Sequence, residues 1–211
     1  MLLDTNNSYK PMRLPIFIVV DISGKEQAQI DRISGKINEL LDKLRRDPFL
    51  LETSHIEIIV YNGCCRVDKP LSEIYEFPEV KITTEPRGEC NQDIFNFIIE
   101  RFDSTLIKTT LEKKGDWRPK IVFFGEGFDK SYDVKDILWK WLLPSNFHYV
   151  CFDPSEYHHL IWYSNDTKEC EHDGVKYTIP PVPYEGRGEE SIYDIDDINL
   201  IDELTKSLQR I

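Results

Sequence analysis

The spacing of apolar residues predicts a strand and then a helix near the start of the chain. Residues 14–20 form a near-continuous apolar run, which is typical of a strand buried on both faces of a parallel sheet. Isoleucines and leucines between positions 30 and 44 then recur at helical spacing among charged residues. This second segment is therefore predicted to be an amphipathic helix that ends near "DP" at 47–48.

Two further strands and a second helix are predicted next. The β-branched segment 55–62 is predicted to be a strand. Residues 65–71 are expected to pair with it as a short edge strand of a hairpin, because Pro70 is unsuited to a central strand. Apolar residues at helical spacing then predict a helix over 91–111, with Asn91 as its N-cap.

The second half of the chain alternates in the same way and then becomes less regular. We predict a buried strand at 120–127, a short helix at 134–143 and an apolar strand at 148–153. Residues 177–190 are rich in proline and glycine and are interpreted as a loop or edge segment, followed at 191–211 by an acidic approach to an amphipathic helix.

This order of elements predicts the fold class. Strands that alternate with helices favour an α/β fold with a doubly wound, mostly parallel sheet and helices on both faces. The length of 211 residues, with 40% hydrophobic content, suits one main domain with a proper core. In such folds the ligand crevice lies beyond the carboxyl ends of the strands.

Charge argues against a nucleic-acid partner. The formal net charge is -12, so phosphate backbones would be repelled unless a local basic patch outweighed the total. Two basic stretches, at 43–46 and 108–114, lie in helical patterns with neighbouring acids. We interpret both as solvated helix faces.

The cysteines and the apolar runs bear on location. Five cysteines, an odd number without paired spacing, do not resemble a disulfide framework, so we expect free thiols, a reducing compartment and a cytoplasmic protein. No uninterrupted apolar run reaches the length of about 18 residues that a membrane-spanning helix needs. Neither secretion nor a membrane partner is expected.

Acidic and hydroxyl side chains follow two of the buried strands. Asp21 and Ser23 come directly after the first strand, and Glu126 lies in the "GEG" turn at 125–127. Oxygen ligands of this kind suit Mg²⁺, so these three residues are candidate metal ligands. The structural alternative is that Asp21 and Ser23 only cap the helix that follows.

Three stretches of the chain together resemble a von Willebrand factor A-type (vWA) domain, in particular the bacterial TerY-like proteins associated with tellurite resistance. They are "RLPIFIVVDISGK", "LRRDPFLLETSHIEIIVYN" and "IKTTLEKKGDWRPKIVFFGEG". The resemblance covers residues 13–153, which we expect to be the vWA-like core. Residues 154–211 are expected to complete the same domain with the Pro/Gly-rich loop and terminal helix. The resemblance implies a Rossmann-like sheet and a protein-binding role, often through a metal-ion-dependent adhesion site.

The first loop of that adhesion site is matched in part. The family pattern is Asp-x-Ser-x-Ser, and Asp21 and Ser23 match it, whereas Lys25 replaces the second serine. An ammonium beside the carboxylates would repel Mg²⁺ and neutralise the same acids. We therefore predict a degenerate site that has lost its cation but kept the partner surface. The alternative is that Lys25 points into water and that the remaining oxygen ligands hold a weak Mg²⁺.

The other two loops of the site also depart from the family pattern. The second should lie near 87–92, where no threonine occurs and where Glu89, Cys90 or Asn91 are the candidates. Glu126 stands where the resemblance implies an aspartate in the third loop and is one methylene longer. With Asp21, Ser23 and Lys25, these residues form the predicted partner-binding surface.

Two other kinds of site were weighed. His158 or His159 with Cys170 and His172 could supply zinc ligands, although no Cys-x-x-Cys pair is present and surface histidines are the simpler interpretation. A Mg²⁺-dependent phosphohydrolase of the haloacid dehalogenase type would use Asp21 as nucleophile. Those enzymes place a second acid two residues later, where this chain has a serine, so we expect no catalysis.

The expected function is an interaction module without a cofactor. By resemblance, TerY-like proteins act alongside a protein kinase and a PP2C-type phosphatase, which become candidate partners in stress or defence signalling. This last step is an analogy, because a shared fold does not fix function.

Overall fold

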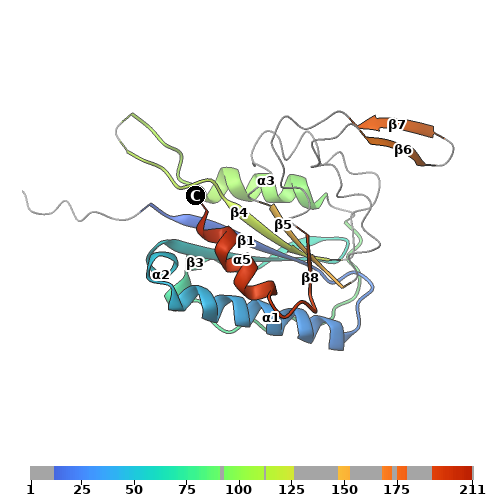
Figure 1. Ribbon diagram of the computed structural model, residues 1–211, viewed down its shortest axis with the longest axis horizontal. Helices are drawn as coiled ribbons and strands as arrows, with labels where there is room; N and C mark the ends of the chain where they lie inside the picture. Colours follow the sequence, from blue (N-terminus) through green and yellow to red (C-terminus); the bar gives the residue numbers. More distant parts are fainter. Residues whose placement is uncertain are drawn as a thin grey trace, which may run out of the picture.

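A six-stranded sheet with the order β3-β2-β1-β4-β5-β8 forms the centre of the protein, with helices on both faces (Figure 1). Neighbouring strands are parallel except for β2 and β3, which are antiparallel. The predicted fold class, a doubly wound, Rossmann-like α/β fold with a mostly parallel sheet, is confirmed by this topology. The computed structural model describes residues 12–90, 93–111, 113–125, 147–152, 168–172, 175–179 and 192–210.

The first predicted strand is the central one. β1 (Leu14–Asp21) pairs in parallel with β2 (Ser54–Tyr61) on one side and with β4 (Lys120–Phe124) on the other. Both faces of the strand are covered, and every residue from Leu14 to Val20 is buried. This is why the strand has a continuous apolar run where a half-exposed strand would alternate.

The first predicted helix is also confirmed, and the "DP" segment at its end both terminates it and begins a second helix. α1 (Gln27–Arg46) buries its apolar stripe against the sheet, and Asp47 follows its last residue. Asp47 then begins a second helix, α2 (Pro48–Thr53), by accepting a hydrogen bond from the backbone N–H of Leu50 at 2.9 Å. Proline is favoured at the first position of a helix because its missing N–H has no intrahelical partner there.

The predicted hairpin is confirmed at the edge of the sheet. β3 (Cys65–Glu73) runs antiparallel to β2 with register shifts along the pair. Pro70 lies exposed in this edge strand, where its missing N–H removes no interior ladder bond. The short 3₁₀ helix η1 (Ile74–Glu76) follows.

The second predicted helix is shorter than the sequence suggested. α3 spans Ile94–Thr105 instead of 91–111. Its N-cap is Asp93, whose carboxylate accepts hydrogen bonds from the backbone N–H groups of Phe95 (2.8 Å) and Asn96 (3.1 Å). The assignment of the N-cap to Asn91 was therefore wrong, and Asn91 itself lies outside the described residues.

The basic stretch at 108–114 is not helical where the structure describes it, contrary to the prediction. The guanidinium of Arg13 ends the helix by donating to both carboxylate oxygens of Asp116 (2.8 and 2.5 Å) and to the carbonyl of Thr105 (3.0 Å). Asp116 also accepts a hydrogen bond from the backbone N–H of Ile107 at 2.8 Å. These contacts turn the chain into a loop that projects beyond the sheet between α3 and β4 (Figure 1).

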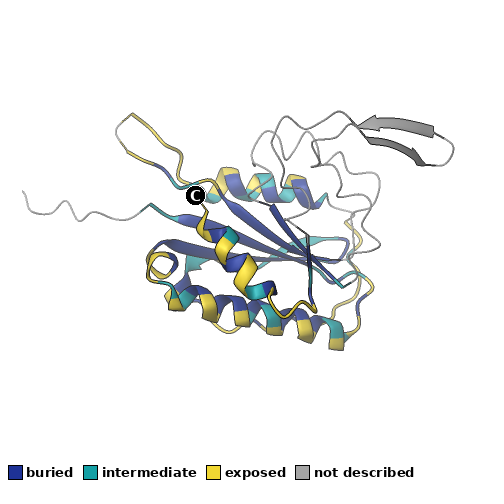
Figure 2. Cartoon of the chain, in the orientation of Figure 1, coloured by how far each residue is buried: buried dark blue, intermediate teal, exposed yellow. Residues whose placement is uncertain are grey.

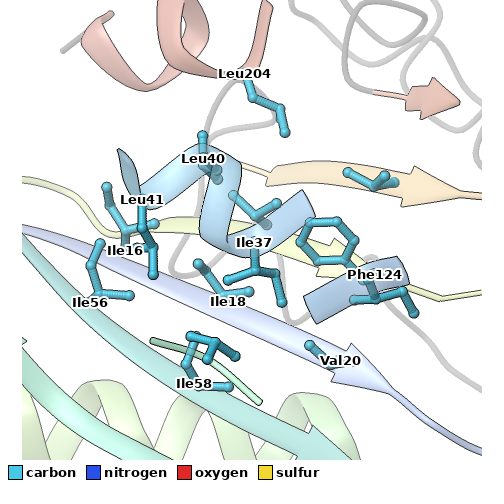
Figure 3. Packing of buried hydrophobic residues seen from close by; sticks show 14 of the residues in the cluster. Ile16, Ile18, Val20, Ile37, Leu40, Leu41, Ile56, Ile58, Phe124 and Leu204 are labelled. Atoms are coloured by element: carbon cyan, nitrogen blue, oxygen red, sulfur yellow. The ribbon is translucent and has the colours of Figure 1, made fainter. Parts of the chain in front are cut away.

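The core has two layers, one on each side of the sheet (Figure 2). On one side, α1 and the C-terminal helix α5 (Leu200–Gln209) pack against the inward residues of β1, β2 and β4. Figure 3 shows this packing. On the other side, α3 packs on a smaller layer that contains Phe17, Phe123 and Tyr149. Helices on both faces explain the continuous apolar strands.

One ion pair is buried in the layer beneath α3. Glu57, in the middle of β2, is completely buried, and Arg101 of α3 donates to its two carboxylate oxygens at 2.7 and 2.8 Å. The backbone N–H of Leu71 in β3 donates to the same carboxylate at 3.1 Å. Glu57 therefore links α3 to both strands of the hairpin, which makes its burial tolerable.

Two ionisable side chains lie in the core on the α5 side. Lys120 of β4 donates hydrogen bonds to the carbonyl oxygens of Arg210 (2.7 Å) and Ser207 (3.5 Å) at the carboxyl end of α5. Burial, with the charge of Arg210, lowers the pKa of Lys120 to about 8. His148 of β5 is buried on the same face, and burial, with the charge of Lys120, lowers its pKa to about 3.

The last part of the chain adds one strand to the main sheet and one helix to the layer that covers it. β8 pairs in parallel with β5, and α5 packs against α1. A separate hairpin of two strands, which the sequence did not predict, lies between β5 and β8 in the chain. The helix predicted at 134–143 lies outside the described residues, and the division of the domain at 153 stays a prediction. The strands are β5 (Phe147–Cys151), β6 (Lys168–His172), β7 (Val175–Ile179) and β8 (Ile192–Asp194).

Candidate functional site

The parallel strands bring the predicted first loop to the carboxyl edge of the sheet. Asp21 is the last residue of β1 and lies opposite Tyr61, the last residue of β2. The backbone N–H of Ile22 still donates to the carbonyl of Tyr61 at 2.9 Å, so β1 leaves the sheet only after this point. The loop that follows therefore begins at the crevice position of an open α/β sheet.

Asp21 shapes this loop through its side chain. Its Oδ1 accepts a hydrogen bond from the backbone N–H of Ser23 at 2.8 Å, which is an Asx turn. Gly24 has a φ of +69°, a left-handed conformation that glycine adopts without steric cost, and the N–H of Lys25 then closes the turn on the carbonyl of Ile22 at 3.2 Å. Asp21 thus orders the loop through its own side chain.

The alternative that Asp21 and Ser23 cap the following helix is wrong. Helix α1 begins after Glu26, and the backbone N–H of Glu26 donates to the side-chain oxygen of Gln29 at 3.0 Å. This is the reciprocal half of a capping box, so the helix has its own N-terminal partners. Asp21 and Ser23 are left to the loop at the sheet edge.

The side chain of Lys25 is turned into the protein. The residue is only 8% exposed, so the alternative in which it points into water from the first helical turn is wrong. A buried ammonium needs oxygen partners, because transfer of an unpaired charge from water is very costly. Lys25 therefore places a buried side chain at the loop position where the adhesion-site pattern would have a serine oxygen.

β4 reaches the same edge beside Asp21. Gly125 follows β4, and its N–H donates to the carbonyl of Val150 at 3.1 Å. A Cβ atom placed on Gly125 would lie 3.4 Å from the Cβ of Asp21, so the two loops are neighbours. Glu126, the next residue and the predicted third-loop acid, lies outside the described residues, and its role stays a prediction.

The predicted second loop is fastened to the turn between β2 and β3. The N–H of Gly88 donates to the carbonyl of Asn62 at 2.7 Å, and the Asn62 side chain donates to the carbonyl of Glu85 at 2.7 Å. A Cβ atom on Gly88 would collide with the sulfur of Cys64, so the close approach requires glycine here. Glu89 is exposed on this loop.

Cys64 and Cys90 form a disulfide between this loop and the hairpin turn. The expectation that the cysteines lack a disulfide was wrong, because spacing in the sequence does not show that the fold brings positions 26 residues apart together. The argument for a reducing compartment thereby loses its main support. The glycines at positions 63 and 88, which allow the two loops to touch, were the available signal.

Negative charge collects beneath the second loop. Cys65, the first residue of β3, has its pKa raised to about 12 by burial and by the nearby carboxylates of Asp93, Asp21 and Glu100. Its sulfur is therefore a thiol at neutral pH and a poor nucleophile.

The described part of this edge is a poor match for a divalent-cation site. It offers the carboxylate of Asp21 and the hydroxyl of Ser23, while the buried residue Lys25 takes the third position of the loop pattern. Among the residues that the structure describes, no three histidine, cysteine or acidic side chains come close enough to hold a metal ion. His158 and His159 lie outside those residues, and of Cys170 and His172 only the backbone in β6 is described.

Comparison with known proteins gives structural similarity only. No family model matches this chain, and none of the curated proteins matches its sequence. In the part of the chain that the structure describes, no helix is long and apolar enough to cross a membrane.

Several solved structures are similar in fold. An aerotolerance-related membrane protein from Bacteroides fragilis is 14% identical with a TM-score of 0.48, and the match covers 94% of this chain and 100% of that one. The mussel-byssus proximal thread matrix protein 1, with a zinc-occupied MIDAS motif, is 11% identical with a TM-score of 0.47 over 93% and 46% of the two chains. The ArnB paralog VWA2 from Sulfolobus acidocaldarius is 13% identical with a TM-score of 0.41; the match covers 67% of this chain and only 35% of that one.

Proposed function

We propose that this protein is a non-catalytic, vWA-like interaction module that binds a protein partner through the loops at the carboxyl edge of its sheet. In this proposal the ammonium of Lys25 takes the place of a divalent cation. The observation that carries the proposal is the burial of Lys25 in the loop that the side chain of Asp21 holds. A built-in positive charge balances the carboxylate of Asp21 without an ion from solution.

The arrangement of the edge favours recognition over chemistry. The Asp21 carboxylate already accepts a hydrogen bond from the Ser23 amide, which orients one of its oxygens into the loop. The position two residues after Asp21, where a phosphohydrolase would place its general acid, is a serine. Exposed Glu89 and the loop around it offer polar groups to a partner.

The resemblance to TerY-like proteins supplies the first partners to test. A protein kinase and a PP2C-type phosphatase are proposed as partners, in a cytoplasmic stress or defence response. These partners rest on the resemblance alone. The cytoplasmic location is the expectation drawn from the cysteine pattern, whose support the Cys64–Cys90 disulfide weakens. Each can be purified and tested separately.

The proposal is tested by binding of the purified kinase and phosphatase to immobilised protein. We expect Glu89→Lys at the proposed edge to weaken binding at least about tenfold, because a new charge faces the partner. Leu111→Ser, a matched exposed change in the loop at the opposite edge, is expected to leave binding unchanged. EDTA is expected to have no effect.

Three results would contradict the proposal. Loss of binding in EDTA would indicate a live metal site. An effect of Leu111→Ser without an effect of Glu89→Lys would place the partner at the other edge. Mg²⁺-dependent hydrolysis of para-nitrophenyl phosphate that is abolished by Asp21→Asn would show that the edge is catalytic.

A further inference from the structure

The Cys64–Cys90 disulfide joins two loops of the proposed partner surface. Cys64 closes the turn before β3, and Cys90 lies in the loop that leads to Asp93, the N-cap of α3. Their Cα atoms are 5.4 Å apart, within the range of about 4.4–6.8 Å that disulfides usually show. The bond therefore fixes the loop that carries Glu89 at the entrance to the helix.

The contacts of this loop fall into two parts. Residues 85–88 have their own links to the hairpin: the two hydrogen bonds with Asn62, and an ion pair between Arg66 and Glu85 at 3.1 Å. Cys90 is attached through its own disulfide, through a hydrogen bond from its N–H to the sulfur of Cys64, and through a long 3.9 Å contact to Gly63. Opening the disulfide would therefore release residues 89–90 and leave 85–88 in place.

The disulfide is open to a reductant from solvent but is protected from exchange with the neighbouring thiol of Cys65. Cys90 is exposed, so a reductant can reach its sulfur from solvent. Cys65, directly after Cys64, is half-buried and packs against the core layer beneath α3. Burial and nearby carboxylates keep it protonated, so exchange of Cys65 into the disulfide is suppressed.

We propose that the Cys64–Cys90 disulfide is a reducible clamp that sets the mobility of residues 89–90, and through it the affinity of the carboxyl edge for its partner. The partner effect rests on the function proposed above, whereas the clamp itself does not. In the redox step a dithiol, such as dithiothreitol or a thioredoxin-type protein, attacks one sulfur as a thiolate and forms a mixed disulfide. The released cysteine takes up a proton.

The second thiol of the reductant then displaces the other cysteine. The reductant becomes a disulfide, and Cys64 and Cys90 together gain two electrons and two protons. Reoxidation by oxidised glutathione reverses the sequence through the same kind of mixed disulfide. The fold itself is expected to survive both steps, because the sheet and both core layers lie outside the clamp.

The test combines iodoacetamide labelling, read by mass spectrometry, with hydrogen exchange of the full chain before and after dithiothreitol. We expect Cys64 and Cys90 to be labelled only after reduction. Exchange at residues 89–90 should then rise at least about tenfold, while Gly88 and β2 are unchanged, because only the local opening equilibrium shifts. The Cys64→Ser/Cys90→Ser double variant should show the fast exchange without reductant, and Cys65→Ser should behave as the wild type.

The outcomes separate this inference from the proposed function. Labelling of Cys64 and Cys90 without reductant, or unchanged exchange at 89–90 after reduction, would overturn the clamp whatever the partner does. A clamp that opens while the kinase and phosphatase bind both redox states equally well would overturn only its role in affinity. A loss of β2 protection on reduction would show that the disulfide stabilises the whole fold instead of acting as a local clamp.

Discussion

Asp21 accepts a hydrogen bond from the backbone amide of Ser23 at 2.8 Å, directly where β1 leaves the sheet. The bond gives this aspartate a structural role in the loop besides its charge. A variant of Asp21 therefore changes the loop as well as the charge of the edge. Variants that separate these two effects are needed before any loss of binding is attributed to charge.

Asp21→Asn and Asp21→Ala are expected to differ for this reason. Asparagine keeps an oxygen that can accept from Ser23, so its free energy of unfolding should stay near that of the wild type. Alanine removes the acceptor and should lower the free energy of unfolding by about 1 kcal/mol, the usual contribution of one hydrogen bond. Urea denaturation of the three proteins checks this, and equal stabilities of the two variants would contradict the Asx turn.

Arg101→Ala is expected to be among the most destabilising single changes. It would leave the carboxylate of Glu57 completely buried without its cation, which costs about 3–5 kcal/mol. The double variant Glu57→Gln/Arg101→Ala should recover part of this loss, because the neutral amide can still accept from the N–H of Leu71. Thermal unfolding of both variants measures the difference, and a double variant no more stable than Arg101→Ala would argue against a buried charge as the cause.

His148 is expected to make the protein sensitive to acid. Its pKa in the folded state is lowered to about 3 from 6.5, so between these values the unfolded chain binds a proton that the folded protein does not. Stability is therefore fully present above pH 6.5 and falls as the pH is lowered toward 3, by about 3 kcal/mol at about pH 4.

The matched control for this prediction is His148→Leu, which replaces the titratable imidazole by an apolar side chain of similar size. Its unfolding free energy, measured by urea denaturation from pH 7 to 4, should fall less steeply than that of the wild type. Within the described residues neither ring nitrogen of His148 has a hydrogen-bond partner, so the variant breaks none there. Parallel pH profiles for the two proteins would show that His148 titrates normally.

The sequence predicts the core elements well because burial leaves a pattern along the chain. β1, α1 and the β2–β3 hairpin follow directly from apolar spacing and from the edge position of Pro70. Helix ends are harder, because Pro48 is compatible both with ending α1 and with beginning α2. The end of α3 at Thr105 is set by Arg13, a residue 92 positions away, whose hydrogen bond no local pattern reveals.

The candidate site could be predicted only in its first loop. Asp21, Ser23 and Lys25 lie close together in the sequence, so the sequence predicts that they share a loop. The burial of Lys25 depends on tertiary packing, which no local pattern reveals. Pairing of Cys64 with Cys90 requires the loop before α3 to fold back on the hairpin turn. That contact is long-range, and the spacing of cysteines alone carries no information about it.

Calorimetric titration with Mg²⁺ and Mn²⁺ tests whether Lys25 occupies the place of a metal ion. Wild type, Lys25→Ser and Lys25→Met are compared, since serine restores an oxygen ligand whereas methionine only removes the charge. We predict no binding to the wild type or to Lys25→Met, and measurable binding to Lys25→Ser. Saturable binding of either ion to the wild type would contradict this prediction.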